Sequence, residues 1–383
     1  MSHEAPSRSG IGGFLFSGEG WPYLLVPFIA IAVALDLAGA GAPLVFFASA
    51  LGVIPTAALM GRATEELAAR SGPGIGGLLN VTFGNAPELI IAFFALHEGL
   101  QEVVKASLVG SILGNVLLVM GASMLVGGLK RERQHFDRTA AGSQSLMLLL
   151  ACAALIMPAI FELVIGGSLP NPLDKSDRFP SDLEAMSIGV SIVLLASYVT
   201  GLFFSLKTHR ALFNPPQDDE ADGHEPWSVR RSVFALAVAG IAVGFMSEIL
   251  VGSIEEASKG IGLSPFFVSL IVVAIVGNAA EHWVAVYFAS RDKLDLSISI
   301  AIGSSAQIAL FAAPVLVLVS LFVGPFPMAL VFNGLELSAI LLAVLIAVIV
   351  ANFVTQEGES TWFEGVQLLA VYTVLGLTFF FVG

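Results

Sequence analysis

The sequence predicts an all-α membrane protein with eleven transmembrane helices, arranged as one N-terminal helix and two inverted five-helix repeats. Three observations lead to this fold class: the composition, the number of long apolar segments, and a motif that occurs twice. Hydrophobic residues make up 56% of the 383 residues and charged residues only 12%, whereas about 25% of residues are charged in a soluble domain. A soluble fold with so few charges could not cover its surface, so the composition favours a membrane protein.

Long apolar segments recur along the whole chain. A helix needs about 20 apolar residues to cross the hydrocarbon core of a bilayer, and the short alternating segments typical of a barrel do not occur. Eleven segments meet the helical requirement: 21–39, 42–60, 74–96, 104–128, 143–165, 184–206, 231–252, 264–289, 295–323, 326–351 and 361–382.

The basic residues predict the orientation. With eleven spans, 13 of the 17 Lys and Arg residues fall on the side of the N-terminus. Because basic loops stay in the cytoplasm, we expect a cytoplasmic N-terminus and an external C-terminus in the plasma (inner) membrane. The first twenty residues lack a basic region followed by an apolar one, so no cleaved signal peptide is expected.

The predicted spans divide the chain into four parts. Residues 1–40 form a tail and the first helix, 41–206 the first repeat, 207–230 a cytoplasmic linker, and 231–383 the second repeat. The linker contains PPQDDEADGHEP, with five acidic residues. It is either a solvated hinge or an acidic surface that concentrates cations near the entrance.

The strongest pattern is a motif that occurs twice, because residues 84–88 read GNAPE and residues 277–281 read GNAAE, 193 positions later. With the same offset, Gly110-Ser111 aligns with Gly303-Ser304, and Thr64-Glu65-Glu66 resembles Ile254-Glu255-Glu256 after a three-residue insertion. Each copy has five spans, an odd number, so the second copy must enter the membrane from the opposite side. Inverted repeats of this kind are typical of secondary transporters, whose sites lie near the midplane at the repeat interface.

Each copy of the motif ends in a glutamate inside an apolar run, Glu88 in the first and Glu281 in the second. An ionised carboxylate at the centre of a membrane helix costs about 2.5–3.5 kcal/mol on insertion scales. Such a group persists when it faces a partner or a wet cavity. One alternative is a neutral glutamate bonded to a backbone carbonyl. The matched pair favours a cation- or proton-binding site.

The residues before each glutamate suit such a site. Gly84 and Gly277 weaken the helix, and Pro87 removes a backbone N–H, so we expect broken helices whose carbonyls face a cavity. Asn85 and Asn278 add amide oxygens. Carboxylates, amides and carbonyls form an all-oxygen ligand set, which Ca²⁺ prefers, whereas Zn²⁺ or Cu⁺ would want His or Cys.

Further polar residues surround the motif. Ser111 and Ser304 lie on the following span of each copy, with Asn115 and Gln307 one turn on. These residues either line the site or pack between helices. His282 follows Glu281 directly and points away from it, so it is either a proton-accessible neighbour or a histidine bonded between helices.

Two acidic pairs flank the membrane ends. Glu65 and Glu66 are expected on the cytoplasmic side, and Glu255 and Glu256 on the external side. Solvated helix ends would explain both pairs. They could also attract cations on opposite faces of the membrane.

The segments GNAPELIIAFFAL, GSILGN, GNAAEH and IAIGSSAQIALF resemble the two alpha repeats of the Ca²⁺/H⁺ exchangers, a branch of the cation/Ca²⁺ exchanger superfamily. The resemblance covers residues 20–382. Na⁺/Ca²⁺ exchangers carry a Ser-Leu-Pro-Glu element in the first repeat, which this chain lacks. The resemblance implies one helix plus two inverted five-helix repeats, and it implies that Glu88 and Glu281 bind Ca²⁺ and protons alternately.

The sequence therefore predicts a secondary antiporter that exchanges Ca²⁺ for H⁺, with Ca²⁺ as transported substrate and no cofactor. A Na⁺/Ca²⁺ or broader divalent cation antiporter is the main alternative, and a cation channel comes from a different class. Neither an enzyme nor a nucleic-acid partner is expected, because no catalytic motif stands out and no basic stripe occurs. The lipid bilayer is the expected surrounding, and a homo-oligomer is left open.

Overall fold

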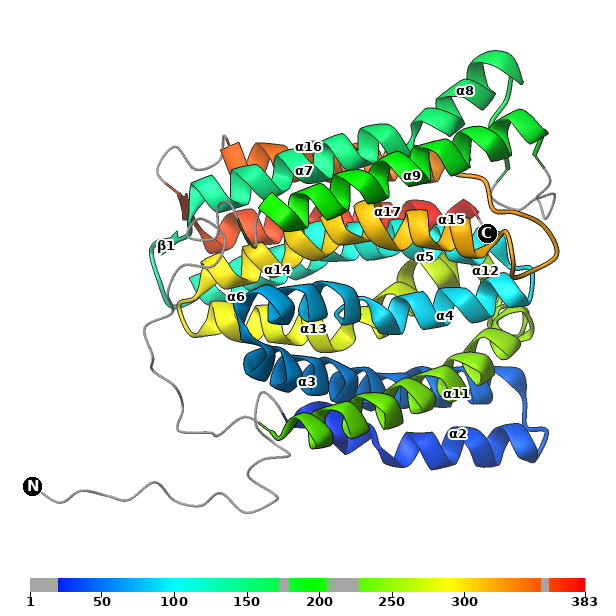
Figure 1. Cartoon of the computed structure of the whole chain (residues 1–383), viewed down its shortest axis with the longest axis horizontal. Coiled ribbons are helices and arrows are strands. Elements are labelled where there is room, and N and C mark those ends of the chain that lie inside the picture. The colour runs from blue at the N-terminus through cyan, green and yellow to red at the C-terminus, as the bar shows by residue number, and fades with distance from the viewer. Residues whose placement is uncertain (1–19, 172–178, 205–206, 208–226, 353–357, 383) are drawn as a thin grey trace, which may run out of the picture.

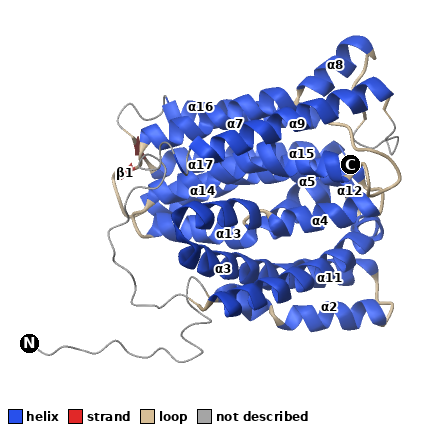
Figure 2. Cartoon of the chain, viewed as in Figure 1, coloured by secondary structure: helices blue, strands red, loops and turns tan. Residues whose placement is uncertain are grey.

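The structure is a computed structural model that describes residues 20–171, 179–204, 207, 227–352 and 358–382. It is built almost entirely of helices that lie side by side along one direction (Figure 1; Figure 2). The bounds of the N-terminal half are η1 Trp21–Leu25, α2 Pro27–Leu37, α3 Ala42–Phe83, α4 Ala86–His97, α5 Gln101–Leu113, η2 Gly114–Val119, α6 Met120–Gly128, α7 Arg138–Leu155, α8 Met157–Ile165 and α9 Ser181–Phe203. Those of the C-terminal half are α11 Val229–Ile261, α12 Pro265–Phe267, η4 Val268–Val273, α13 Ala274–Ser290, α14 Leu294–Gln307, η5 Ile308–Ala312, α15 Ala313–Val319, α16 Gly334–Asn352 and α17 Trp362–Val382.

Within the described residues, eight helices are long and apolar enough to cross a membrane. Three shorter apolar helices accompany them, at Trp21–Leu37, Ala86–His97 and Gly334–Val350. The chain is therefore a multi-pass membrane protein, as its composition predicts. The count of eleven spans and the inverted-repeat layout stay predictions. The acidic residues of the linker lie outside the described residues.

Helix α3 contains the predicted span 42–60 and the first part of the predicted span 74–96. Its 42 residues would reach about 63 Å if straight, twice the roughly 30 Å of a hydrocarbon core. A Cβ atom placed on Gly76 would lie 3.3 Å from Cα of Ala68, although eight residues of straight helix would separate these positions by about 12 Å. The chain therefore reverses direction within α3, and the second run leads into α4 (Figure 1).

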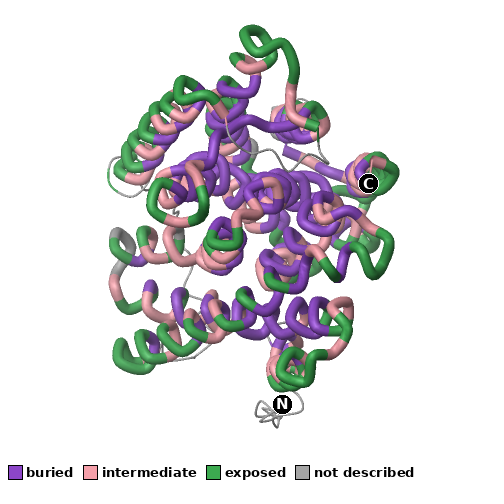
Figure 3. Tube along the Cα trace, turned by 90° about the vertical axis from the view of Figure 1, so that its right-hand side faces the viewer, coloured by how far each residue is buried: buried purple, intermediate pink, exposed green. Residues whose placement is uncertain are grey.

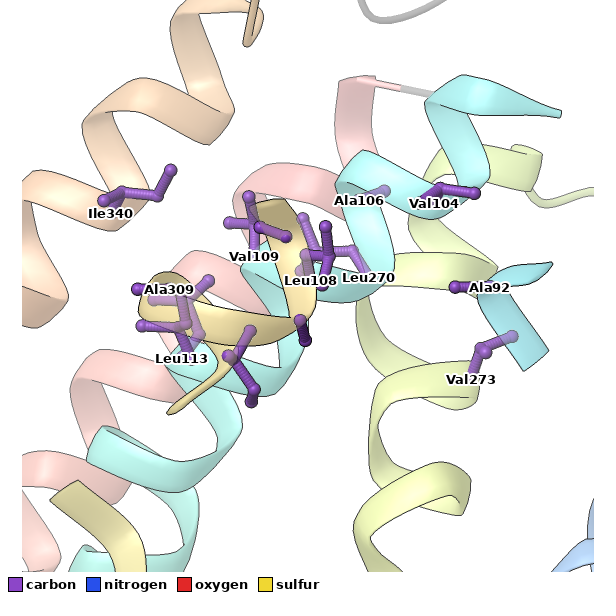
Figure 4. Packing of buried hydrophobic residues seen from close by; sticks show 14 of the residues in the cluster. Ala92, Val104, Ala106, Leu108, Val109, Leu113, Leu270, Val273, Ala309 and Ile340 are labelled. Atoms are coloured by element: carbon purple, nitrogen blue, oxygen red, sulfur yellow. The ribbon is translucent and has the colours of Figure 1, made fainter. Parts of the chain in front are cut away.

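The core is formed by the helices at the centre of the bundle, which Figure 3 shows largely buried. In the apolar stretch of Gln101–Gly128, 78% of the residues are buried inside the protein. In the apolar stretch of Trp362–Val382, only 17% are buried. Helix α5 packs against η4 so closely that a side chain at Gly110 would overlap the Leu270 backbone. Leu108, Val109 and Leu113 of α5 gather there with Ala309 and other small or branched residues (Figure 4).

One end of the bundle is fastened by a short β pair. β1 (Gln134–His135) pairs antiparallel with β2 (Glu359–Ser360). An ion pair of 2.6 Å between Arg133 and Glu359 reinforces the pairing. The connections before α7 and α17 are thereby held together beside the inner helices.

Candidate functional site

Glu88 lies in the first turn of α4 and points into a small cavity between α4, α5, η4 and α13. Apolar side chains make up most of the cavity wall, and Ser107, Ser111 and Gly277 are among its other lining residues. The cavity volume is about 10 Å³, close to the smallest volume of this kind that can hold one water molecule. Oε2 of Glu88 is buried and finds no hydrogen-bond partner among the described residues. Such an atom is free to bind a proton or a cation.

Backbone geometry explains why Glu88 stands at a helix start. Helix α3 ends at Phe83, Gly84 and Asn85 interrupt it, and α4 begins at Ala86. Pro87 stands in the first turn of α4, where its missing N–H is tolerated, and it cannot donate to the carbonyl four residues earlier. The break expected in the first copy of the motif is confirmed.

The corresponding break in the second copy was expected but is not present. Helix α13 runs from Ala274 to Ser290 through Gly277 and Asn278. The residue that corresponds to Pro87 is Ala280, which keeps its N–H and favours a helix. A glycine alone costs about 1 kcal/mol in a helix, and the packing of α13 at the centre of the bundle outweighs that cost.

Glu281 faces the same region from α13. Its Oε2 atom accepts a hydrogen bond of 2.9 Å from Oγ of Ser304 on α14. Glu281 is also close enough to Glu88 for direct repulsion between the two carboxylates. The structure thus brings both predicted glutamates into the same region between the two halves of the chain.

The glycine of each motif copy lies against the glutamate of the other. A Cβ atom on Gly84 would lie 3.6 Å from Oε1 of Glu281. A Cβ atom on Gly277 would lie 3.6 Å from Cγ and 3.8 Å from Oε1 of Glu88. Both glycines therefore leave room beside a carboxylate, and the two copies of the motif cross at this point.

The motif asparagines join the two halves of the chain. Nδ2 of Asn85 donates to Oε1 of Gln307 at 2.6 Å, and Nδ2 of Asn278 donates to Oγ of Ser111 at 3.0 Å. The Oδ1 atoms of both asparagines are buried and have no partner among the described residues. With Oε2 of Glu88, three buried oxygens of the kind that hard cations bind are unpaired.

His282 contacts Asn115 across the same boundary, with 3.1 Å between Nε2 and Oδ1. This favours the histidine bonded between helices over the proton-accessible alternative. Every predicted polar residue of the two motif regions thus has a place in the site or in its immediate support.

The flanking acidic pairs are brought to the site only in part. Glu65 is exposed and lies close enough to Glu281 for charge repulsion. Glu66 instead accepts a hydrogen bond of 2.7 Å from the backbone N–H of Trp227. Glu255 is partly exposed and Glu256 exposed, at the far end of α11. Of these four residues, Glu65 is the one whose charge acts on a motif glutamate.

Two features of the site were not predicted from the sequence. Ser107 lines the Glu88 cavity, and its place one turn before Ser111 on the same helix face could have indicated this. The π-helical segments η2 and η5 directly follow the site residues of α5 and α14. π-Helical turns occur often at functional sites, but no residue pattern in the sequence announces them.

A metal ion at this site would need more ligands than side-chain carboxylates supply. The described residues contain no group of three or more His, Cys, Asp or Glu that could hold a metal. Two carboxylates, two amide oxygens and serine hydroxyls are the available donors. This set suits a hard cation that is held and released, and not a soft metal held permanently.

Comparison with known proteins decides the family. The profile of the family described as sodium/calcium exchanger protein matches residues 41–207 and 231–381. The chain belongs to this family. A Ca²⁺/H⁺ antiporter of Synechocystis is 41% identical over 378 residues, which cover 94% of this chain and 96% of the relative. The Ca²⁺/H⁺ antiporter ChaA of Bacillus subtilis is 44% identical over 331 residues, 86% of this chain and 89% of ChaA.

Members of this exchanger family with solved structures share the fold. The structure of native YfkE matches with a TM-score of 0.78 at 39% identity, covering 94% of this chain and 99% of YfkE. The resemblance to Ca²⁺/H⁺ exchangers that the motifs indicate is therefore confirmed.

Proposed function

We propose that this exchanger moves Ca²⁺ in one direction and H⁺ in the other by alternating access, with Glu88 and Glu281 as the shared binding groups. The observation that carries the proposal is the convergence of these two carboxylates beside unpaired buried oxygens. The names of the relatives, Ca²⁺/H⁺ antiporters, support the same substrates.

The chemistry follows from charge balance. Two ionised carboxylates repel each other in a buried site, and a divalent cation or protons relieve that repulsion. Amide oxygens of Asn85 and Asn278 complete the oxygen shell around Ca²⁺. Protons that arrive from the other side neutralise the carboxylates, so the cation loses its counter-charge and leaves. Because one site serves both ions, the two fluxes are coupled.

We further propose that residues 41–206 and 231–383 are inverted repeats, separated by the 207–230 linker. Support comes from contacts that pair equivalent positions. Ser305 Oγ lies 3.5 Å from the carbonyl of Ile112, and these residues are themselves 193 positions apart. The distribution of Lys and Arg supports a cytoplasmic N-terminus and an external C-terminus in the plasma membrane, and we include this orientation in the proposal.

Vesicle transport tests this function. Purified protein in liposomes should take up radiolabelled Ca²⁺ when a proton gradient is imposed, and not when a Na⁺ gradient replaces it. Uptake driven by a Na⁺ gradient alone would favour the alternative of Na⁺/Ca²⁺ exchange. The family is itself described as sodium/calcium exchanger protein. Currents at fixed pH without counter-transport would instead indicate a channel.

A further inference from the structure

A second buried polar cluster lies where α5 and α16 begin, away from the glutamates of the motifs. It consists of Lys105 and Glu336, which are 1% and 0% exposed, and of Glu102, whose side chain is 18% exposed. Lys105 forms an ion pair with Glu102 one turn earlier on α5. Ser107, which lines the Glu88 cavity, follows Lys105 by two residues, but none of the three cluster residues lines that cavity. The cluster is therefore separate from the site of Glu88 and Glu281.

The cluster joins α5 to the segment that precedes α16. Nζ of Lys105 donates to the carbonyl of Val331 at 2.9 Å, and the ring of Phe179 lies 5.6 Å away. Oε2 of Glu336 accepts a hydrogen bond of 2.9 Å from the backbone N–H of Asn333. This bond at the start of α16 explains the position of one carboxylate oxygen of Glu336. It does not explain why Lys105 and Glu102 lie nearby.

The charges within this cluster do not balance. The cluster contains two carboxylates and one ammonium group. Glu336 lies close enough to Glu102 and Lys105 to interact with both charges. Oε2 of Glu102 and Oε1 of Glu336 are buried without a partner among the described residues. A buried charge without compensation costs several kcal/mol. Among the residues that the structure describes, one positive charge and at least one hydrogen-bond donor are missing from this cluster.

We propose that Glu102, Lys105 and Glu336 form a second proton-binding site, in which one of the two carboxylates is protonated. A bound proton supplies the missing charge, and the O–H group that it creates is the missing donor. A metal ion would be repelled by the ammonium of Lys105, which is already paired with Glu102. The site then holds a neutral set of one ammonium, one carboxylate and one carboxylic acid.

No other buried ionisable group provides the missing charge within the described surroundings. His97 and Glu98 at the end of α4 are exposed. On α9, Asp182 is exposed and Glu184 partly exposed. The segment 320–333 carries no ionisable side chain.

The proposal has a consequence for stability. At neutral pH the folded protein holds this proton, whereas an exposed glutamate in the unfolded chain does not. The folded state binds more protons, so the free energy of unfolding falls as pH rises. Loss of the proton would weaken the contact between α5 and the segment before α16, independently of the transported protons.

Infrared spectroscopy on the purified E88Q/E281Q protein tests the proposal, because this background removes the carboxyls of the transport site. We expect a protonated-carboxyl band that disappears as pH is raised, together with a falling Tm. Adding E336Q or E102Q should abolish the band, since the remaining carboxylate is balanced by Lys105. Adding K105M should enlarge the band, since both carboxyls must then take up a proton.

E364Q is the matched control, because Glu364 accepts a hydrogen bond of 3.0 Å from Thr361 N–H at the start of α17, as Glu336 does for Asn333. It should leave the band unchanged in the E88Q/E281Q background. Absence of a titrating band in that background overturns the proposal, as does a band that persists in folded E102Q or E336Q protein. If E336Q does not fold, E102Q and K105M decide.

Discussion

Asn85 and Gln307 are 222 positions apart in the chain, yet Nδ2 of the first lies 2.6 Å from Oε1 of the second. On the other side of the site, Asn278 reaches Ser111 in the same way. Each motif asparagine thus holds a residue from the opposite half of the chain. This arrangement predicts which substitutions disturb Ca²⁺ binding and which only disturb packing.

Replacing Asn85 with Ala should raise the KM for Ca²⁺, because it removes one amide oxygen and leaves Gln307 unpaired in a buried site. An unsatisfied buried group costs about 1–3 kcal/mol, so an effect of roughly tenfold or more is expected. Initial rates of Ca²⁺ uptake into proteoliposomes measure it. S338A, at an exposed position of α16, should behave as the parent protein. An unchanged KM in N85A would remove Asn85 from the site.

Gly277→Ala should fold normally and bind Ca²⁺ less tightly. Its Cβ atom would sit at ordinary contact distance, 3.6 Å from Cγ of Glu88, and would narrow the space beside the carboxylate. Gly277→Leu should abolish exchange. The control is G376A on α17, where a Cβ atom meets nothing within 4 Å. Full exchange by the leucine variant would show that this space is not used.

The helix break at Gly84–Asn85 should depend on Pro87. Replacing Pro87 with Ala restores the N–H and lets α3 continue into α4, so exchange should fall while Tm stays the same or rises. The reciprocal variant A280P should destabilise α13 by about 3 kcal/mol, the usual cost of proline inside a helix. Circular dichroism melts and uptake rates distinguish the two. Equal exchange by P87A and the parent would make the break incidental.

His282 should act through its bond to Asn115 and not as a proton carrier. H282Q retains a side chain that can bond Asn115, so its pH profile of exchange should match that of the parent protein. H282A should lose activity at every pH, because Asn115 is left unpaired. A shift of the pH profile in H282Q would reverse this assignment.

Much of the site could be predicted from the sequence because its signal is a repeated motif. An ionisable residue in a long apolar run is costly, so Glu88 and Glu281 stand out without any coordinates. The pairing of Asn85 with Gln307 could not be predicted, since contacts between distant helices depend on how the bundle packs. Helix α13 is unbroken, contrary to the prediction, because Gly277 weakens a helix far less than a proline does.

The reversal within α3 agrees with the predicted spans 42–60 and 74–96, which must cross the membrane in opposite directions, although the helix continues through it. Another feature was predicted less well. Glu336 lies inside the predicted span 326–351, where the sequence shows it as a further intramembrane carboxylate besides Glu88 and Glu281. Its link to Lys105, 231 positions earlier in the chain, is visible only in three dimensions.

The central claim is that Glu88 and Glu281 bind Ca²⁺ and protons in competition, and one measurement tests it most directly. Proton-gradient-driven uptake of radiolabelled Ca²⁺ is compared among the parent protein, E88Q and E281Q, each reconstituted at equal amounts after its fold is verified. The account predicts that each substitution lowers exchange at least about a hundredfold, since a lost ionic ligand at a buried site costs several kcal/mol. Exchange at the parental rate in both folded variants would contradict it.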